Sequence, residues 1–313
     1  MSVLEELARR AASGEALGLA TVVRTEGSSP GQPSMKMLVG REGRVAGTIG
    51  GGHVEATVEA ACRAALDGAP ARVLAFTLDD SLADEGGLIC GGTVHVLVER
   101  VEPPAAWAAR AAALERGGRR GVLLARVGAS VAREVLEGTA AEPWLRGEEP
   151  SFREGTFVEL LCRPRCVVLG AGHVGRIVAR VAAEAGFLVC AVDDREAQAA
   201  RLPGVRVVCA PLAEGFASLE PGRDDYVVVA TRGHGLDLAC CRAALASPAR
   251  YVGMLGSRKK AAAVREALAR DGRDAGRLHA PIGLDLGATS AGEIAVSVVA
   301  QMIKVRRVGR GDR

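Results

Sequence analysis

The sequence predicts an α/β protein, with an N-terminal mixed α/β domain followed by a C-terminal doubly wound parallel sheet. The chain has 313 residues, which is enough for two domains when each takes about 100 to 200 residues. From Cys166 onward, segments typical of strands alternate with segments typical of helices. A glycine-rich turn joins the first of these strands to the helix after it.

Composition and charge match those of an ordinary compact protein. Hydrophobic residues make up 49% of the chain and charged residues 25%, values that exclude a disordered or fibrous class. The formal net charge is +3, and the basic residues are scattered apart from clusters at 258–260 and 304–313. Such clusters are typical of a solvated helix face and of a chain end, so nucleic-acid binding is not expected.

The sequence also bears on compartment and metal content. It has no stretch of roughly 18 uninterrupted apolar residues, the length that a membrane-spanning helix needs. Residues 1–13 include acidic residues where a signal peptide has a basic start and an apolar middle. We therefore expect a cytoplasmic protein without a membrane partner. The cysteines include no pair at the Cys-x-x-Cys spacing of zinc or redox sites, and no metal site is predicted.

The N-terminal half is predicted to combine helices with strands. The helix that ends at Leu66 follows from apolar residues at helical spacing, which begin at Val54. A hairpin is expected around Gly43 because two short apolar runs flank it. The expected elements are a helix at 2–12, strands at 16–24, 35–39 and 44–49, a helix ending at 66, strands at 72–78 and 93–101, a helix at 105–116, and strands at 121–127 and 157–161.

Residues 138–154 are rich in Gly, Pro, Glu and Arg, which is typical of a linker or a surface excursion. We therefore expect one domain at 1–140 and another at 165–313. A linker and a connecting strand at 141–164 would join them.

The C-terminal half is predicted to contain a parallel sheet. Its strand-like segments are rich in valine and do not alternate with polar residues, as expected for strands that are covered on both faces. The expected strands are 166–169, 188–192, 205–209, 226–230 and 251–255.

The turn after the first of these strands has the Gly-x-Gly-x-x-Gly spacing of a Rossmann fingerprint. Gly170 permits a tight turn, Gly172 leaves room for a phosphate, and Gly175 lets the helix pack closely on the strand. The start of that helix offers free N–H groups to an anion. His173 lies inside the turn, where it can contact the phosphate.

Asp193 ends the next strand, where an acidic side chain can accept hydrogen bonds from the hydroxyls of a ribose. This favours NAD or another adenine nucleotide with a free 2′-hydroxyl. Arg195 leaves NADP open, because a nearby arginine can accommodate a 2′-phosphate. A Rossmann-like domain that holds no nucleotide is the other alternative, since fold does not dictate function.

A series of motifs in both halves is similar to that of the XdhC/CoxI family, accessory proteins of molybdenum hydroxylases such as xanthine dehydrogenase. The resemblance leaves out mainly residues 103–165. The motifs are TVVRTEGSSPGQPSMKMLV (21–39), GTIGGGHVEA (47–56), ICGG (89–92), VVLGAGHVG (167–175), VDDR (192–195), RGHGLDL (232–238), YVGMLGSRKK (251–260) and HAPIGLDLGATSAGEIAVSVVAQMI (279–303).

The resemblance implies an accessory or maturation factor rather than a catalyst. Such a chaperone binds molybdenum cofactor (molybdopterin), protects it, and supports its sulfuration and its insertion into a xanthine dehydrogenase-type hydroxylase. The implied partners are that hydroxylase, a cysteine desulfurase and a second copy of the chain in a homodimer. His53 stands where family members often have cysteine, which argues against a scheme with two cysteines.

Two candidate sites lie in the N-terminal half. Cys90 precedes two glycines that leave its sulfur accessible, and a thiolate suits a soft metal or sulfur transfer. We assign Cys90 as the candidate sulfur or molybdenum ligand, with simple packing as the alternative. Gly50, Gly51 and Gly52 meet the start of a helix that has Glu55 in its first turn. They form either a cradle for the pterin phosphate or a tight corner in which Glu55 complements the helix dipole.

The remaining candidates follow strands of the C-terminal sheet. His234 and Asp237 come after one strand, and Ser257 and Arg258 come after the next. Both pairs fall at carboxyl ends of strands, where doubly wound sheets bind ligands. His234 with Asp237 also keeps a second function open, that of an NAD-dependent oxidoreductase acting on a small molecule. A third hypothesis is a nucleotide-sensing module without chemistry.

Overall fold

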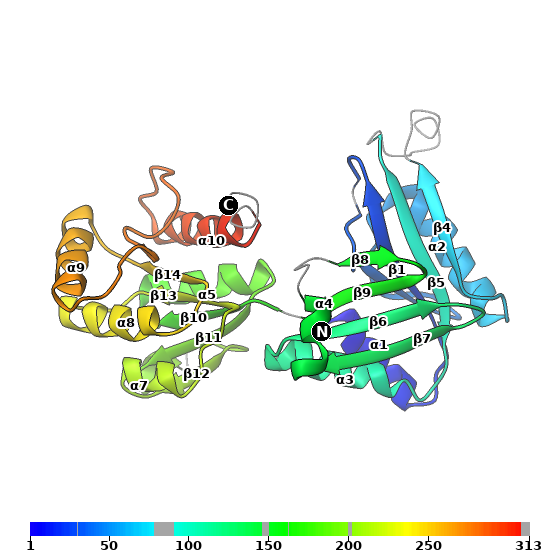
Figure 1. The fold of residues 1–313 in the computed structure, drawn as a ribbon, viewed down its shortest axis with the longest axis horizontal. Coiled ribbons are helices and arrows are strands. Elements are labelled where there is room, and N and C mark those ends of the chain that lie inside the picture. The colour runs from blue at the N-terminus through cyan, green and yellow to red at the C-terminus, as the bar shows by residue number, and fades with distance from the viewer. Residues whose placement is uncertain (30, 78–90, 146–149, 162, 200–201, 308–313) are drawn as a thin grey trace. The chain divides into compact units, whose positions relative to one another are not determined.

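The computed structural model describes residues 1–29, 31–77, 91–145, 150–161, 163–199 and 202–307. The chain divides into two compact units, Met1–Cys162 and Arg163–Arg313 (Figure 1). The observed α/β class, with antiparallel sheets in the first unit and a parallel sheet in the second, confirms the predicted fold class.

The N-terminal unit contains two antiparallel sheets, with strand orders β3-β2-β1-β5-β4 and β7-β6-β9-β8. The strands are β1 (Leu17–Glu26), β2 (Lys36–Gly40), β3 (Gly43–Gly47), β4 (Arg72–Thr77), β5 (Thr93–Val101), β6 (Gly121–Val127), β7 (Val131–Glu137), β8 (Ser151–Arg153) and β9 (Thr156–Leu161). The helices are α1 (Val3–Ala12), α2 (Gly52–Leu66), α3 (Ala106–Gly117) and α4 (Glu142–Leu145), and a 3₁₀ turn, η2 (Gly138–Ala140), precedes α4.

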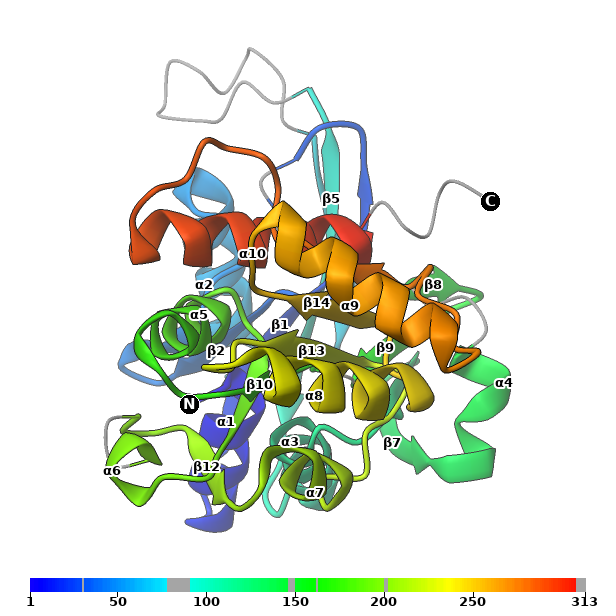
Figure 2. The same cartoon turned by 90° about the vertical axis from the view of Figure 1, so that its left-hand side faces the viewer.

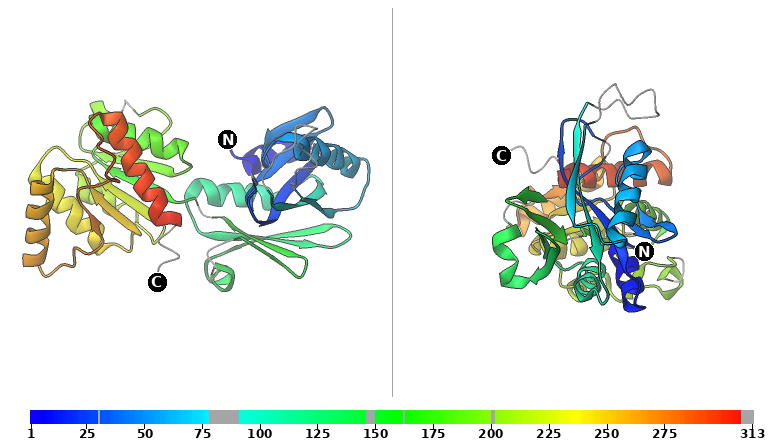
Figure 3. Two further views of the ribbon diagram at one scale, coloured as in Figure 1. Left: turned by 90° about the horizontal axis from the view of Figure 1, so that it is seen from above. Right: turned by 90° about the vertical axis from the view of Figure 1, so that its right-hand side faces the viewer.

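The first sheet of this unit is covered on both faces (Figure 3). In β1 the side chains alternate, so that Leu17 and Leu19 pack toward α1 and α3 while Ala20 and Val22 pack toward α2. This period of two is the normal consequence of the pleated backbone. Helix α1 begins with a capping box, in which Ser2 and Glu5 each accept a hydrogen bond from the backbone of the other.

Two buried ion pairs connect the two sheets. Lys36 on β2 pairs with Glu159 on β9, and all but 5% of each side chain is buried. Glu99 on β5 pairs with Arg133 on β7, whose guanidinium also lies 4.7 Å from the centre of the Trp107 ring. Because a buried charge is costly without its partner, these pairs fix which residues of the two sheets face each other.

The stretch expected to be a linker belongs instead to the N-terminal unit. Residues 138–145 form η2 and α4, and Ser151–Arg153 forms the edge strand β8. Ala141 and Leu145 pack on the outer face of the second sheet. The units divide between Cys162 and Arg163. The polar segment stays with the N-terminal unit because its strand β8 pairs with β9 and so satisfies the backbone hydrogen bonds of both. Composition alone does not reveal this pairing.

The C-terminal unit contains a single parallel sheet of order β12-β11-β10-β13-β14-β15. The strands are β10 (Arg165–Leu169), β11 (Leu188–Asp193), β12 (Arg206–Cys209), β13 (Asp225–Val229), β14 (Tyr251–Met254) and the short β15 (Leu278–His279), which the sequence did not predict. The helices are α5 (His173–Glu184), α6 (Glu196–Ala199), α7 (Leu212–Ala217), α8 (His234–Ala246), α9 (Arg258–Arg270) and α10 (Ala291–Arg307).

Helices cover both faces of this sheet, as the valine-rich strands predict. Helices α5 and α10 pack on one face, and α7, α8 and α9 pack on the other (Figure 2). Numbered within the sheet, the strand order is 3-2-1-4-5-6, the order of dinucleotide-binding Rossmann domains. The order reverses between β10 and β13, which is where such sheets bind ligands.

The Lys36–Glu159 pair generates the first prediction. We expect Lys36→Met to destabilise the N-terminal unit by about 3 to 5 kcal/mol, because it leaves the Glu159 carboxylate buried without its partner. The double variant Lys36→Met/Glu159→Leu should recover most of that loss. Both tryptophans, Trp107 and Trp144, lie in this unit, so urea unfolding followed by tryptophan fluorescence reports on it selectively.

The control is Arg126→Ala, which breaks an exposed ion pair with Glu134 on the second sheet. Such pairs contribute about 0 to 1 kcal/mol. If Lys36→Met were no less stable than this control, the buried pair would have no special part in joining the sheets.

Candidate functional site

The main candidate site is a pocket of about 240 Å³ at the carboxyl ends of β10, β11 and β13. The switch point of the sheet and the pocket therefore coincide. The predicted residues that line it are Gly170, Gly172, His173, Gly175, Asp193 and Arg195. Asp194, Thr231 and Arg232 line it as well, although the sequence did not single them out.

The glycine turn has the geometry that its spacing predicts. Gly170 has a φ of +104°, and a Cβ there would lie 2.5 Å from the carbonyl oxygen of Ala230. A Cβ on Gly175 would lie 2.0 Å from the carbonyl oxygen of Gly170. A Cβ on Gly172 would meet nothing within 4 Å, so the space beside Gly172 is open to a ligand. Gly172 precedes α5 without any side-chain cap.

Asp193 is only 1% exposed and accepts four hydrogen bonds. The N–H of Ala171 donates to Oδ2 at 2.7 Å, and Arg195 donates to the two oxygens through its backbone N–H, Nε and Nη2 at 2.8 to 3.0 Å. Burial raises the pKa of the Asp193 carboxyl, but the bonds from Arg195 and Ala171 outweigh burial and hold this pKa below its ordinary value. Asp193 therefore ties the glycine turn to the end of β11.

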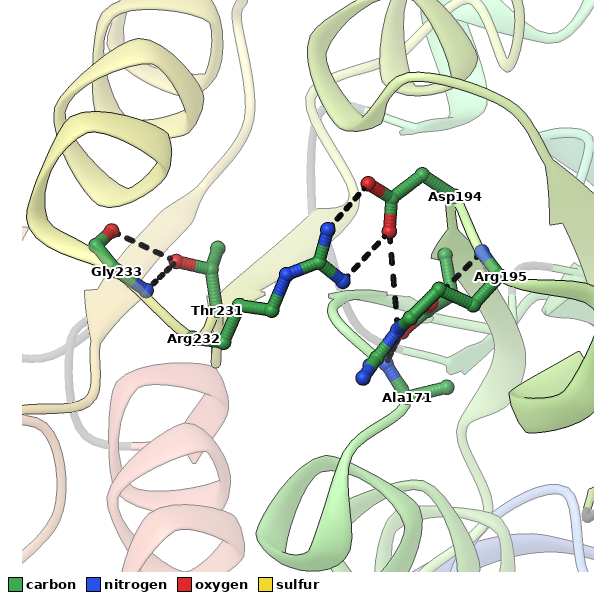
Figure 4. A network of polar contacts seen from close by, with 7 residues as sticks. Ala171, Asp194, Arg195, Thr231, Arg232 and Gly233 are labelled. Carbon is green, nitrogen blue, oxygen red and sulfur yellow. Dashed lines mark hydrogen bonds and ion pairs between the residues drawn. The ribbon is translucent and has the colours of Figure 1, made fainter.

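Asp194 and Arg232 form an ion pair across the pocket (Figure 4). Arg232 donates from Nη1 and Nη2 to the two carboxylate oxygens of Asp194, at 2.9 and 2.7 Å. The pair joins the turn after β11 to the turn after β13. Sequence reasoning missed both residues, although each comes two residues after a predicted strand, close to the position that points to Asp193.

A second polar cluster lies behind the pocket wall. Thr231 Oγ1 donates to Oδ1 of Asp237 at 2.7 Å, and Lys260 forms an ion pair with the other oxygen of this fully buried carboxylate. His234 is exposed, whereas the Asp237 carboxylate is buried and engaged by these two partners. Lys260, which the sequence reasoning also missed, thereby links α9 to the first turn of α8.

Ser257 and Arg258 lie at the start of α9 but outside the main pocket. The Ser257 hydroxyl accepts a hydrogen bond from the N–H of Lys260 at 3.3 Å and so caps the helix. Arg258 is exposed and lines a separate hollow of about 320 Å³ beside the loop 281–288. These two residues therefore do not join Asp193 in one site.

The Gly50–Gly52 turn in the N-terminal unit is already occupied by a carboxylate of the chain. The three glycines have positive φ, at 127°, 88° and 68°. Glu55 accepts hydrogen bonds from the N–H groups of Ile49 and Gly51 at 3.1 and 3.2 Å, and from the Thr48 hydroxyl. Burial raises the pKa of Glu55, but these bonds outweigh burial and leave the pKa below its ordinary value. A pterin phosphate in this cradle would have to displace Glu55.

Glycines bring three segments of the chain close together at one end of the first sheet, near Ser28 and Gly31, near Ile49, and near Gly92. A Cβ on Gly92 would lie 2.2 Å from the carbonyl oxygen of Ser28, and a Cβ on Gly31 would lie 2.8 Å from that of Ile49. These close approaches require glycine at both positions. Cys90 lies outside the described residues, two positions before Gly92.

The described cysteines differ sharply in exposure. Burial raises the pKa of the Cys62 thiol to about 12, and Cys240 and Cys241 are buried with similarly raised pKa values. Cys209, at the end of β12, is exposed. Among the described residues, no three His, Cys, Asp or Glu side chains gather as a metal site would require.

Family models match both units. Residues 10–77 match the model of the XdhC and CoxI family, and residues 166–302 match that of the XdhC Rossmann domain. Together they cover more than half of the chain. The chain belongs to the XdhC/CoxI family. The resemblance indicated by the sequence motifs is thereby confirmed. Within this XdhC/CoxI chain, the Gly50–Gly52 turn lies in the first matched region and the main pocket in the second.

Two curated proteins are similar to this XdhC/CoxI chain over nearly its whole length. The uncharacterized protein YqeB of Escherichia coli is 26% identical over 318 residues, which cover 99% of this chain and 47% of that protein. The chain thus spans about half the length of that relative. A Bacillus subtilis protein, named as a probable xanthine dehydrogenase subunit, is 26% identical over 310 residues, which cover 92% of this chain and 93% of that protein.

Among solved structures, one described as a xanthine dehydrogenase from Bacillus halodurans aligns with a TM-score of 0.80. The alignment covers 98% of this chain and 96% of that one at 23% identity, a likeness of fold alone. Among the described residues of this XdhC/CoxI protein, no helix is both long and apolar enough to cross a membrane.

The occupied glycine turn generates the second prediction. We expect Glu55→Ala to lower the free energy of unfolding by about 1 to 3 kcal/mol, because two backbone N–H groups and a hydroxyl lose their acceptor. Glu55→Gln should lose less, since one side-chain oxygen can still accept. Chemical denaturation followed by tryptophan fluorescence measures the effect.

Glu59→Ala is the matched control, because Glu59 lies one turn further along α2 and pairs with Arg63 in the same helix. Pairs of that kind contribute about 0.3 to 0.5 kcal/mol. Equal losses in Glu55→Ala and Glu59→Ala would mean that the turn does not depend on its carboxylate.

Proposed function

We propose that this protein is an accessory factor of a xanthine dehydrogenase-type molybdenum hydroxylase. It binds molybdenum cofactor and supports the sulfuration of that cofactor and its insertion into the hydroxylase. The observation that carries the proposal is membership of the XdhC/CoxI family, with matches in both units. The name of the Bacillus subtilis relative, which describes it as a probable xanthine dehydrogenase subunit, supports a role in the same system.

The N-terminal unit supplies the proposed sulfur chemistry. Cys90 comes two positions before Gly92, which lies at the end of the first sheet close to the carbonyl of Ser28. A soft thiolate suits a sulfur-bearing or molybdenum centre. Cys62 is unsuitable, because burial raises the pKa of its thiol to about 12 and so keeps it protonated at neutral pH. A cysteine desulfurase would deliver sulfur to such a site, and a homodimer in the cytoplasm is the proposed working form.

The C-terminal pocket is proposed to hold a nucleotide, either NAD or another adenine nucleotide, or the nucleotide part of the cofactor. The uncapped start of α5, beside His173, suits an anionic ligand. Arg232 can pair with a phosphate once a ligand takes its place on Asp194. When bound, the molybdenum cofactor would supply the redox metal and the terminal sulfur. The chain itself would bind the phosphate and shield the ligand from water.

The alternative, an NAD-dependent oxidoreductase, is favoured by the strand order and by the pocket at the switch point. Against it, His234 is exposed while Asp237 is buried and bonds to Thr231 and Lys260. The accessory role is therefore the stronger proposal.

The third prediction tests this role through Cys90. We expect Cys90→Ser to fold normally but to lower the pterin that copurifies with the protein, or the activity per molybdenum of a coexpressed hydroxylase. The physical reason is that a serine hydroxyl stays protonated at neutral pH and is a poor ligand for a soft centre. Pterin is measured by fluorescence after oxidation, and molybdenum by elemental analysis.

Cys209→Ser is the control for loss of an exposed thiol, and Cys62→Ala is the control for loss of a buried one. Neither should change pterin content or hydroxylase activity. Equal values for wild type and Cys90→Ser would remove Cys90 from the mechanism, and wild type without any pterin or effect on the hydroxylase would overturn the proposed role.

A further inference from the structure

The acidic residue that ends the second strand of a Rossmann sheet is expected to read the ribose, but here Asp193 has no free capacity to do so. All but 1% of it is buried. Each of its oxygens accepts two hydrogen bonds, from Ala171 and Arg195. To accept two ribose hydroxyls, Asp193 would have to release Arg195 and expose the end of the glycine turn.

Asp194 can exchange its partner for a ligand more readily than Asp193 can. Its side chain is 31% exposed and lines the pocket. Its main partner is Arg232, which is 50% exposed and comes from a different turn. Exposed ion pairs contribute little to stability, so this pair exchanges partners far more easily than the buried network of Asp193.

The geometry of the pair matches that of a ribose diol. Arg232 presents two donors to the two oxygens of Asp194, at 2.9 and 2.7 Å. The adjacent 2′- and 3′-hydroxyls of a ribose present two donors in a similar way. Arg232, once released, remains at the pocket wall beside Thr231, where its charge can pair with a phosphate of the same ligand.

We propose that Asp194, rather than Asp193, accepts the hydrogen bonds of the ribose hydroxyls, and that it selects nucleotides with a free 2′-hydroxyl. This inference rests on the proposed nucleotide site of the C-terminal unit. The selection has two causes. A 2′-phosphate would meet the negative charge of Asp194, and Arg195, the cation that would otherwise receive it, is held by Asp193 through Nε and Nη2.

The fourth prediction compares ADP with 2′-deoxy-ADP, which differ only in the hydroxyl concerned. Calorimetry on the 313-residue chain should give wild type a preference for ADP of about tenfold or more, the usual effect of a hydrogen bond to a charged group. In Asp194→Asn the preference should fall to less than about threefold, because the charged acceptor is gone. The preference for NAD over NADP should shrink in the same variant.

Asp271→Asn is the control, because Asp271 also forms an exposed ion pair with an arginine but lies at the far end of α9, outside the pocket. It should keep the wild-type preference. Asp193→Asn is included with a melting curve as a check of its folding. The comparison of ADP with 2′-deoxy-ADP binding to Asp194→Asn decides the question even if Asp193→Asn does not fold.

The outcomes separate the two proposals. If Asp194→Asn keeps the full preference for ADP over 2′-deoxy-ADP, the inference is overturned while the nucleotide site stands. If wild type binds ADP and 2′-deoxy-ADP equally, no side chain reads the 2′-hydroxyl and the inference is again overturned. If wild type binds neither, both the inference and the nucleotide site fail, whereas the accessory role is judged separately by the pterin and hydroxylase measurements on Cys90→Ser.

Discussion

The pocket of the C-terminal unit depends on the buried carboxylate of Asp193. Its bonds to the N–H of Ala171 and to Arg195 hold the glycine turn against the end of β11. The glycine turn directs the start of α5 toward the pocket, where the N–H groups of the first helical turn can face a ligand. A buried carboxylate is stable only when its oxygens are satisfied, so the same bonds that shape the site remove Asp193 from direct recognition.

Much of the C-terminal fold could be predicted from the sequence, because its strands are local valine-rich runs and its glycines stand at fixed spacing. Val167 and Val227 lie where that pattern places them, in neighbouring parallel strands. The short strand β15 was missed because two residues carry no periodicity. Residues 138–154 were misread for another reason: their composition is that of a loop, whereas β8 is formed by pairing with β9, a contact that local composition does not reveal.

The sequence could predict where the residues of the candidate site lie in the fold, but not which side chains they bond to. The sequence placed Asp193, His234 and Asp237 after strands of the sheet. In the structure Asp193 ends β11, whereas His234 and Asp237 lie in the first turn of α8, which follows β13. The sequence could not reveal that Asp237 bonds to Thr231 and Lys260, because Lys260 is 23 residues further along the chain and reaches it only through the packing of α9 on α8. Asp194 and Arg232 were missed for the same reason, since their pairing across two turns exists only once the sheet has formed.

In each of the two candidate sites described above, a carboxylate of the chain already engages a group that could bind an anion. Glu55 occupies the Gly50–Gly52 turn, and Asp194 neutralises Arg232 in the pocket. An incoming phosphate therefore gains only the difference between its own contacts and those it displaces. A small anion such as free phosphate can replace the two carboxylate oxygens but has no further group to make contacts elsewhere. It therefore gains little free energy from that exchange. A nucleotide or pterin phosphate gains more, because its base or ring adds contacts that the carboxylate lacks. We therefore expect the paired charges to favour larger ligands over free phosphate.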